Sequence, residues 1–256
     1  MGRARANTLT EGECLTASLL ALDDLENYYR WLFEEVRPFF GERLVEIGAG
    51  IGTFTALLVR SHVSCHPTAR LEVFEPEGTL YQHLHKRLKT AHPDLLRAGR
   101  LTATNEVFRS SPERFDTVLM INVLEHIADD QASIRAAYHA LVPGGTFVVF
   151  VPALLWLYSA LDRAVGHYRR YEKPHLEGLL RTGGFDVVKS KYMDCMGVLP
   201  WYLLNVVGRR TSINTHLAHF YDTWFVPFTR WLEGLQKPWF GKNVLVVARK
   251  NAARAS

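Results

Sequence analysis

The chain has 256 residues, 48% of them hydrophobic, and a formal net charge of +4. This is enough apolar sequence for one sizeable domain with a core and a lid. Its basic residues form no long run, so no nucleic-acid partner is expected. Cys14, Cys65 and Cys195 are far apart and form no C-x-x-C motif, which excludes a disulfide framework or cysteine zinc site and favours a cytoplasmic location.

Neither an export signal nor a membrane span is predicted. Residues 1–13 are polar and lack the apolar centre of a signal peptide, and we expect residues 1–22 to be a flexible N-terminus. The most apolar stretch, residues 196–207, is interrupted by Pro200 and is shorter than the ~20 residues of a spanning helix.

Residues 23–40 have apolar side chains at helical spacing, and Pro38 and Gly41 end that pattern. A strand, a glycine-rich turn and a helix to about residue 60 are predicted to follow, because residues 44–54 read LVEIGAGIGTF. Glycine lets the backbone turn sharply and approach a ligand, and the first N–H groups of a helix favour polar or anionic groups. A nucleotide-type cofactor is therefore expected at this turn.

The glycines are spaced G-x-G-x-G, which differs from the G-x-G-x-x-G of dinucleotide-binding turns and disfavours a nicotinamide enzyme. With Glu46 two residues before the first glycine, the pattern resembles motif I of the class I, Rossmann-like S-adenosylmethionine (SAM)-dependent methyltransferases. Three later segments resemble the same class: a strand at 71–75 ending in an acid, FDTVLMINVLEHI at 115–127, and LVPGG before an apolar strand at 146–151.

The resemblance covers residues 24–250 and is greatest to a bacterial subgroup with VEIGAGIG, NVLEHI and GHYRRY segments, the last at 166–171. It implies an α/β fold with a mostly parallel sheet and an antiparallel last strand. The expected parts are a SAM-binding core at 23–191, an inserted segment at 192–242, and the last strand with the tail at 243–256.

The resemblance also implies SAM as cofactor. The expected cradle consists of Glu46, Gly48, Gly50 and Gly52, with Asn122 beside the methionine portion. Glu75, at the end of the second strand, is suited to accept hydrogen bonds from the ribose hydroxyls. An acid usually contacts adenine after the third strand (100–104), and Asn105 or Glu106 takes that place here.

Methyl transfer to a neutral acceptor needs alignment and removal of one proton. His167 and His126 are candidate bases because histidine titrates near neutrality, and Tyr171 is a third candidate. Expected acceptor contacts are Tyr28, Tyr158, Arg170 and Trp201, although Tyr28 could simply pack on the sheet and Arg170 could pair with Asp162. Some methyltransferases hold a divalent cation with E-x-x-E-H and a distant histidine. Here Asn122 replaces the first acid, leaving Glu125, His126 and His167, and no metal is predicted.

The insertion is rich in aromatic residues, and we interpret it as a helical lid near the carboxyl ends of the strands. It could instead form a homodimer interface or contact a membrane surface. The predicted function is methyl transfer to O, N or C of a small, hydrophobic, aromatic acceptor such as a natural product. The alternatives are a methyltransferase for a lipid-linked sugar at the membrane surface and a non-catalytic SAM-binding protein.

Overall fold

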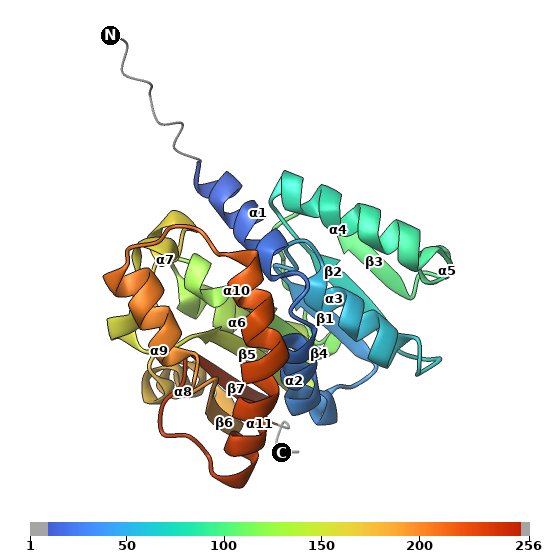
Figure 1. The fold of residues 1–256 in the computed structure, drawn as a ribbon. Coiled ribbons are helices and arrows are strands. Elements are labelled where there is room, and N and C mark those ends of the chain that lie inside the picture. The colour runs from blue at the N-terminus through green and yellow to red at the C-terminus, as the bar shows by residue number, and fades with distance from the viewer. Residues whose placement is uncertain (1–9, 252–256) are drawn as a thin grey trace.

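Short apolar runs of the sequence form the strands, and turns and helices connect them. The computed structural model describes residues 10–251 and contains one seven-stranded sheet in the order β3-β2-β1-β4-β5-β7-β6 (Figure 1). The bounds are β1 (Arg43–Ile47), β2 (Arg70–Phe74), β3 (Leu101–Thr104), β4 (Phe115–Ile121), β5 (Leu141–Pro152), β6 (Phe185–Met193) and β7 (Asn243–Lys250). Neighbours from β3 to β5 are parallel, whereas β7 is antiparallel to both β5 and β6. The predicted α/β sheet is confirmed.

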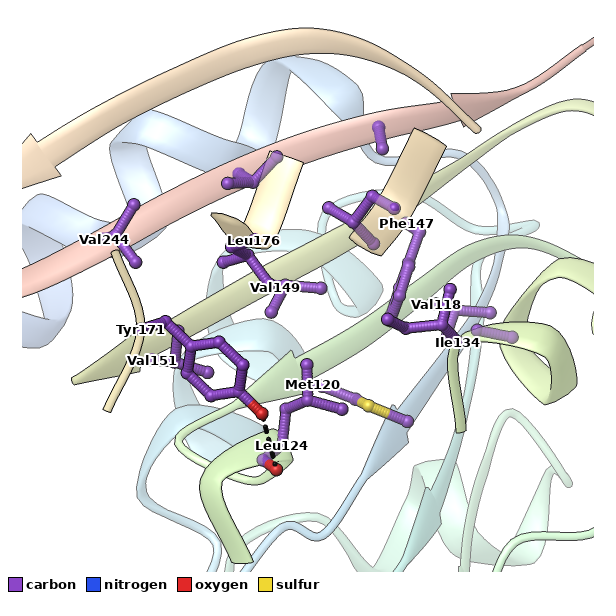
Figure 2. Packing of buried hydrophobic residues seen from close by; sticks show 14 of the residues in the cluster. Val118, Met120, Leu124, Ile134, Phe147, Val149, Val151, Tyr171, Leu176 and Val244 are labelled. Carbon is purple, nitrogen blue, oxygen red and sulfur yellow. Dashed lines mark hydrogen bonds between the residues drawn. The ribbon is translucent and has the colours of Figure 1, made fainter. Parts of the chain in front are cut away.

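Successive strand residues point to opposite sides of the sheet, so both faces carry apolar side chains. Helices cover each face and bury these side chains. On one side Val118 and Phe147 pack with α6 (Asp130–Ala140) and α8 (Lys173–Thr182), and Figure 2 shows part of that cluster. On the other side Leu119 and Val148 pack with α2 (Glu26–Val36), α3 (Thr53–Leu58) and α4 (Gly78–Ala91). The shorter helical segments are η1 (Arg37–Phe39), η2 (Val59–Val63), α5 (Pro93–Arg97), η3 (Leu124–His126), η4 (Leu155–Leu157) and α7 (Ala160–Ala164).

Part of the predicted flexible N-terminus is a helix. Residues 11–22 form α1 (Glu11–Leu22), and Thr10 and Glu13 close its first turn with reciprocal side-chain to backbone hydrogen bonds. This capping satisfies backbone donors at the helix start. Residues 1–9, which belonged to the same prediction, lie outside the described residues. A second difference is the start of β5, which begins at Leu141 opposite Phe115 of β4. The segment at 142–145 that was expected to be a turn interrupts this register, and pairing resumes where Thr146 lies opposite Thr117.

The insertion between β6 and β7 is helical, as expected, and begins after β6 ends at Met193. Its segments are α9 (Val198–Trp201), η5 (Tyr202–Val207), α10 (Thr215–Phe220), η6 (Tyr221–Phe225) and α11 (Val226–Leu235). It is joined to the core by Asp222, whose carboxylate accepts the backbone N–H groups of Asn27 (3.0 Å) and Tyr28 (2.8 Å) at the start of α2. Among residues 10–251, no helix combines the length and apolar character needed to cross a membrane.

Candidate active site

A cavity of about 900 Å³ lies at the carboxyl ends of β1, β2, β4 and β5. Open α/β sheets bind ligands at this edge. The glycine turn and the strand ends form one part of its wall, and helices outside the sheet layers form much of the rest. Those helices contribute Leu15, Ser18, Leu19 and Leu22 from α1, and Leu204, Asn205, Leu217, Ala218, Tyr221 and Phe225 from the insertion.

The glycine turn needs residues without a Cβ. Gly48 (φ +71°) and Gly50 (φ +58°) have left-handed backbones and line the cavity. A Cβ on Gly48 would lie 2.7 Å from a methyl group of Val123, and one on Gly50 would lie 3.2 Å from the Leu19 side chain. Gly52 (φ +85°) is not part of the cavity wall, contrary to its predicted role in the cradle. It lets α3 begin close to Leu84 of α4.

Glu75 lies opposite the glycine turn at the end of β2. Its two carboxylate oxygens accept the N–H groups of Gly50 (2.7 Å) and Glu77 (2.9 Å). Burial raises the pKa of Glu75, and these two hydrogen bonds partly offset that rise. A carboxylate is thereby fixed at the cavity wall, 25 residues after the turn in sequence.

Glu46 also faces the cavity but in a different protonation state. The hydroxyl of Thr55 donates to its carboxyl group at 2.6 Å. Burial raises the pKa of Glu46 to about 8, and the nearby Glu75 adds to the rise. Glu46 is therefore a neutral acid at neutral pH and can donate one hydrogen bond as well as accept.

The predicted adenine contact needs correction. The side-chain amide of Asn105 donates to the backbone carbonyls of Glu75 (2.8 Å) and Pro76 (3.2 Å), and neither Asn105 nor Glu106 lines the cavity. The amide holds the loop after β2 instead. This end of the cavity has an apolar wall formed by Phe74, Pro76, Leu80, Val107 and Phe108.

Asn122 lines the cavity where β4 ends, as predicted. Its φ of +53° is left-handed, which is uncommon for a residue other than glycine and typical of functional sites. Its backbone N–H bonds to the carbonyl of Phe150 in β5 at 2.7 Å, so the strained residue is fixed to the sheet.

The two predicted histidines meet in the cavity with their rings edge to face and 4.5 Å between centroids. His167 Nδ1 lies 2.9 Å from Asp162, which also accepts the guanidinium of Arg170 (3.0 Å). Burial alone would raise the pKa of Asp162, but the hydrogen bond from His167 and the charge of Arg170 hold it below its usual value. A charged Asp162 accepts the Nδ1 proton, which leaves His167 Nε2 as the free acceptor.

His126 is a poor candidate for the base. Burial lowers the pKa of His126 to about 3, and the adjacent His167 contributes to the decrease. Its imidazole stays neutral at physiological pH, which suits a hydrogen-bonding or ligand role more than one that must hold a proton.

Glu125 completes a potential cation site with the two histidines. One ligand atom from each of Glu125, His126 and His167 lies within 4.8 Å of the others. Both carboxylate oxygens of Glu125 are buried and make no hydrogen bond to any described residue, and burial raises its pKa to about 7. Two neutral imidazoles and one carboxylate suit a divalent cation, and Asp162 supplies the outer contact that such a histidine commonly makes. This geometry counts against the prediction of no metal.

Three predicted site residues, Tyr171, Tyr158 and Arg170, lie outside the cavity wall and make hydrogen bonds to residues around it. The hydroxyl of Tyr171 donates to the backbone carbonyl of Leu124 at 3.2 Å (Figure 2) and to the carboxylate of Asp130 at 3.1 Å. Tyr171 is fully buried and burial raises its pKa, so it is a core residue and not a candidate base. Tyr158, whose hydroxyl donates to the His167 carbonyl at 2.7 Å, also lies outside the cavity wall.

Arg170 is the third of these residues. Its guanidinium is buried, binds both oxygens of Asp162 and donates to the Ala153 carbonyl at 3.1 Å, so it is not free for an acceptor. The alternative that Arg170 pairs with Asp162 is the one observed. Trp201 lies next to this guanidinium and does line the cavity, as does Tyr28.

The sequence reasoning missed α1 and a lysine. The S/T-x-x-E signature at Thr10–Glu13 is the signal that could have found α1. Lys242 lines the cavity, forms an ion pair with Asp194 at 2.8 Å and lies over three aromatic rings. Those rings, 5.2 to 5.9 Å from the ammonium nitrogen, belong to Tyr28, Trp201 and Tyr221.

Comparison with known proteins agrees with this geometry. Residues 45–147 match the family model described as a methyltransferase domain. The ubiquinone biosynthesis O-methyltransferase of Xanthomonas campestris pv. campestris is 26% identical over 191 residues, which cover 68% of this chain and 74% of that relative.

Two solved structures show the shared fold. Phosphoethanolamine N-methyltransferase 2 of Haemonchus contortus, in complex with SAM, superposes with a TM-score of 0.59 at 14% identity, covering 96% of this chain and 58% of that one. A SAM-dependent methyltransferase of Mesorhizobium loti gives 0.57 at 16% identity, covering 88% and 100%. The chain is an S-adenosylmethionine-dependent methyltransferase with a class I fold.

Proposed function

We propose that the enzyme methylates an oxygen atom of a small, hydrophobic, aromatic acceptor, with His167 as the base. The observation that carries this proposal is the Asp162–His167 pair in a cavity whose walls are mostly apolar. The relatives named ubiquinone biosynthesis O-methyltransferases support oxygen as the methylated atom. A phenol is the acceptor class that combines such an oxygen with the aromatic, apolar character that suits this cavity.

The cofactor end is the part formed by the glycine turn, Glu75 and Glu46. We infer that Glu75 accepts the ribose hydroxyls in place of its present contact with the Gly50 N–H. The apolar slot at Phe74, Val107 and Phe108 takes the adenine ring, and Asn122 lies beside the methionine portion. When bound, SAM supplies a methyl group on a sulfonium, which is transferred in one displacement and leaves a neutral thioether.

The acceptor end is assigned to Tyr28, Trp201 and the insertion, across the cavity from the adenine slot. His167 Nε2 takes the hydroxyl proton as the oxygen forms its bond to the methyl carbon, and the imidazolium is stabilised by Asp162. Asp162 is a positioning residue, because it acts only through the ring orientation and the charge of His167. Alignment of oxygen, methyl and sulfur supplies the larger share of the acceleration, ~7–11 kcal/mol.

The test combines an acceptor screen with variants of His167. Phenols with apolar substituents should turn over, and indoles, amines and carboxylates should not.

His167→Ala should lower kcat by roughly 10²-fold or more, while the affinity for SAM measured by calorimetry stays unchanged. The wild-type rate should rise from acid pH and level off, because only neutral imidazole accepts a proton. His175→Ala on the exposed face of α8 is the control. Turnover and a pH profile near normal in His167→Ala and His167→Gln would remove His167 from the mechanism.

A second mechanism, in which a divalent cation assists, is favoured by the unpartnered carboxylate of Glu125 beside both histidines. A cation there would bind the acceptor oxygen and lower its pKa without a protein base. Dialysis against EDTA distinguishes the two. Loss of turnover that Mg²⁺ or Zn²⁺ restores, and that Glu125→Gln abolishes, supports the cation. Unchanged turnover after chelation supports His167 as the base.

A further inference from the structure

The insertion contains one continuous helical stretch, residues 215–235, formed by α10, η6 and α11. Figure 1 shows α10 and α11 end to end on the outside of the molecule. Six apolar side chains recur along it at intervals of three or four residues, the spacing of one helix face. They are all exposed, from 46% to 68%, and we call them the outer stripe: Leu217, Phe220, Trp224, Phe228, Trp231 and Leu235. Leu217 and Phe220 also line the cavity, whereas the other four side chains lie outside its wall.

The opposite face of the same helix is buried and largely polar. Asp222, Thr229 and Glu233 are each at most 5% exposed. Asp222 caps α2 and Glu233 accepts the N–H of Cys195 at 2.9 Å, so these polar groups join the insertion to the core. The usual arrangement of a surface helix is the reverse, with apolar residues inside and polar residues outside. An exposed apolar face of this length marks an interaction surface.

The acidic residues of the insertion are buried and its basic residues are mostly exposed. Its acids, Asp194, Asp222 and Glu233, are all buried. Its exposed charged residues are all basic: Arg209, Arg210, Arg230 and Lys237. The facing helix α2 contributes Glu26, Arg30 and Glu34, of which Glu34 lies 3.4 Å from Arg230 in a solvent-exposed pair that holds little energy. The exposed charges of the insertion beside the outer stripe are therefore basic, and the acids next to them, Glu26 and Glu34 of α2, are each paired with an arginine.

A groove of about 420 Å³ runs beside the stripe between α2 and α11. Arg30 and Arg230 line it together with Trp231 and Leu235. Each arginine forms a solvent-exposed ion pair with a glutamate of α2, Arg30 with Glu26 at 3.5 Å and Arg230 with Glu34 at 3.4 Å, which an incoming phosphate would displace. Two guanidinium groups next to apolar side chains suit a phosphate with an attached acyl chain, because arginine binds phosphate oxygens through paired N–H groups.

We propose that the outer stripe docks on the surface of an anionic phospholipid bilayer. The apolar side chains enter the boundary between headgroups and acyl chains, where tryptophan is favoured, and the basic residues contact the headgroups. A second copy of the chain fits less well, since a twofold contact through this face would bring the same basic residues together. The proposal concerns attachment to the membrane and holds for any acceptor.

Binding of the full-length protein to vesicles tests the proposal. Co-sedimentation with phosphatidylcholine vesicles that contain phosphatidylglycerol should be at least tenfold stronger than with phosphatidylcholine alone. The tryptophan emission should shift to the blue on binding, and added salt should weaken the binding. Phe228→Glu and Arg230→Glu should each reduce binding about tenfold or more. The control Val188→Glu, at an exposed apolar position on β6, should bind as the wild type does.

Thermal unfolding and SAM binding, measured on each variant, show whether it is folded. Equal binding to neutral and anionic vesicles, or full binding by folded Phe228→Glu, overturns the proposal. So does a concentration-dependent dimer in sedimentation velocity that Phe228→Glu disperses while vesicle binding is absent, because the stripe would then be a contact between copies.

Discussion

At the scale of single residues, Glu75 gives the clearest test of the cofactor cradle. Glu75→Ala removes the acceptor at the end of β2 and should weaken SAM binding by about 1.5–3 kcal/mol, the range for a lost hydrogen bond to a charged group. Isothermal titration calorimetry measures this. Glu72→Ala is the control on the same strand, because Glu72 forms an exposed pair with Arg114 away from the cavity. Equal SAM affinity in both variants would reject the role of Glu75.

Glu46 predicts a pH dependence of stability. Its pKa is about 8 in the folded protein against a reference value of 4.5. Between these values the folded state holds a proton that the unfolded state has lost, so the free energy of unfolding falls as pH rises from 5 to 8. Glu46→Gln removes this titration and keeps an acceptor for Thr55. Urea unfolding measures this: between pH 5 and pH 8 the free energy of unfolding of the wild type should fall by at least about 1 kcal/mol more than that of the variant. Parallel pH profiles for the two proteins would contradict this.

The residue predictions that failed did so for a common reason. Arg170 and Tyr171 lie in the segment that does bring His167 to the cavity, but their side chains point into the protein. Arg170 is held by Asp162, and Tyr171 by Leu124 and Asp130. Sequence identifies a loop that reaches a site, whereas tertiary packing decides which of its side chains enter. The positions of Gly48, Gly50 and Glu75 at the cavity could be predicted more closely, because a left-handed turn and the end of a strand restrict where a residue lies.

At the scale of elements, α1 closes the cavity above the glycine turn. Leu19 lines the cavity, and Leu20 beside it is exposed. Leu19→Ala should weaken SAM binding roughly fivefold, because about 1 kcal/mol of apolar contact with the ligand is lost. Leu20→Ala, the same change one position along, should leave the affinity unchanged. Calorimetry on the two variants decides, and an equal effect would show that α1 does not cover the bound cofactor.

The strands were predictable from their apolar runs, whereas only the capping signature at Thr10–Glu13 marked α1. Residues 118–121 of β4 are all apolar because both faces of the sheet are covered, and this pattern can be recognised in the sequence. In α1 the apolar residues line a cavity and contact neighbouring helices, and they do not pack in a core. The helix therefore lacks the single apolar face that a sequence pattern would reveal. The early start of β5 was missed because Leu141 pairs with Phe115 before Pro143, Gly144 and Gly145 interrupt the register between the two strands.

At the scale of the whole molecule, ligand binding should raise stability by mass action. At a SAM concentration 100 times its Kd, the free energy of unfolding should rise by about 2.7 kcal/mol. For a chain of this length the melting temperature rises by about 2–4 °C per kcal/mol. Scanning fluorimetry measures the shift. The same concentration of NAD should leave the melting temperature unchanged, and a comparable shift with NAD would contradict the cofactor specificity.

The position of the insertion within the sheet has an evolutionary consequence. Met193, where β6 ends, and Asn243, where β7 begins, are paired across the two strands. Paired residues in antiparallel strands lie about 4.5–5.5 Å apart. The segment between them therefore leaves and re-enters the scaffold at one point, and a hairpin of a few residues could replace it without moving a strand. Under the proposed function, exchange of this one segment would change acceptor preference and leave the strands that carry the glycine turn and Glu75 in place.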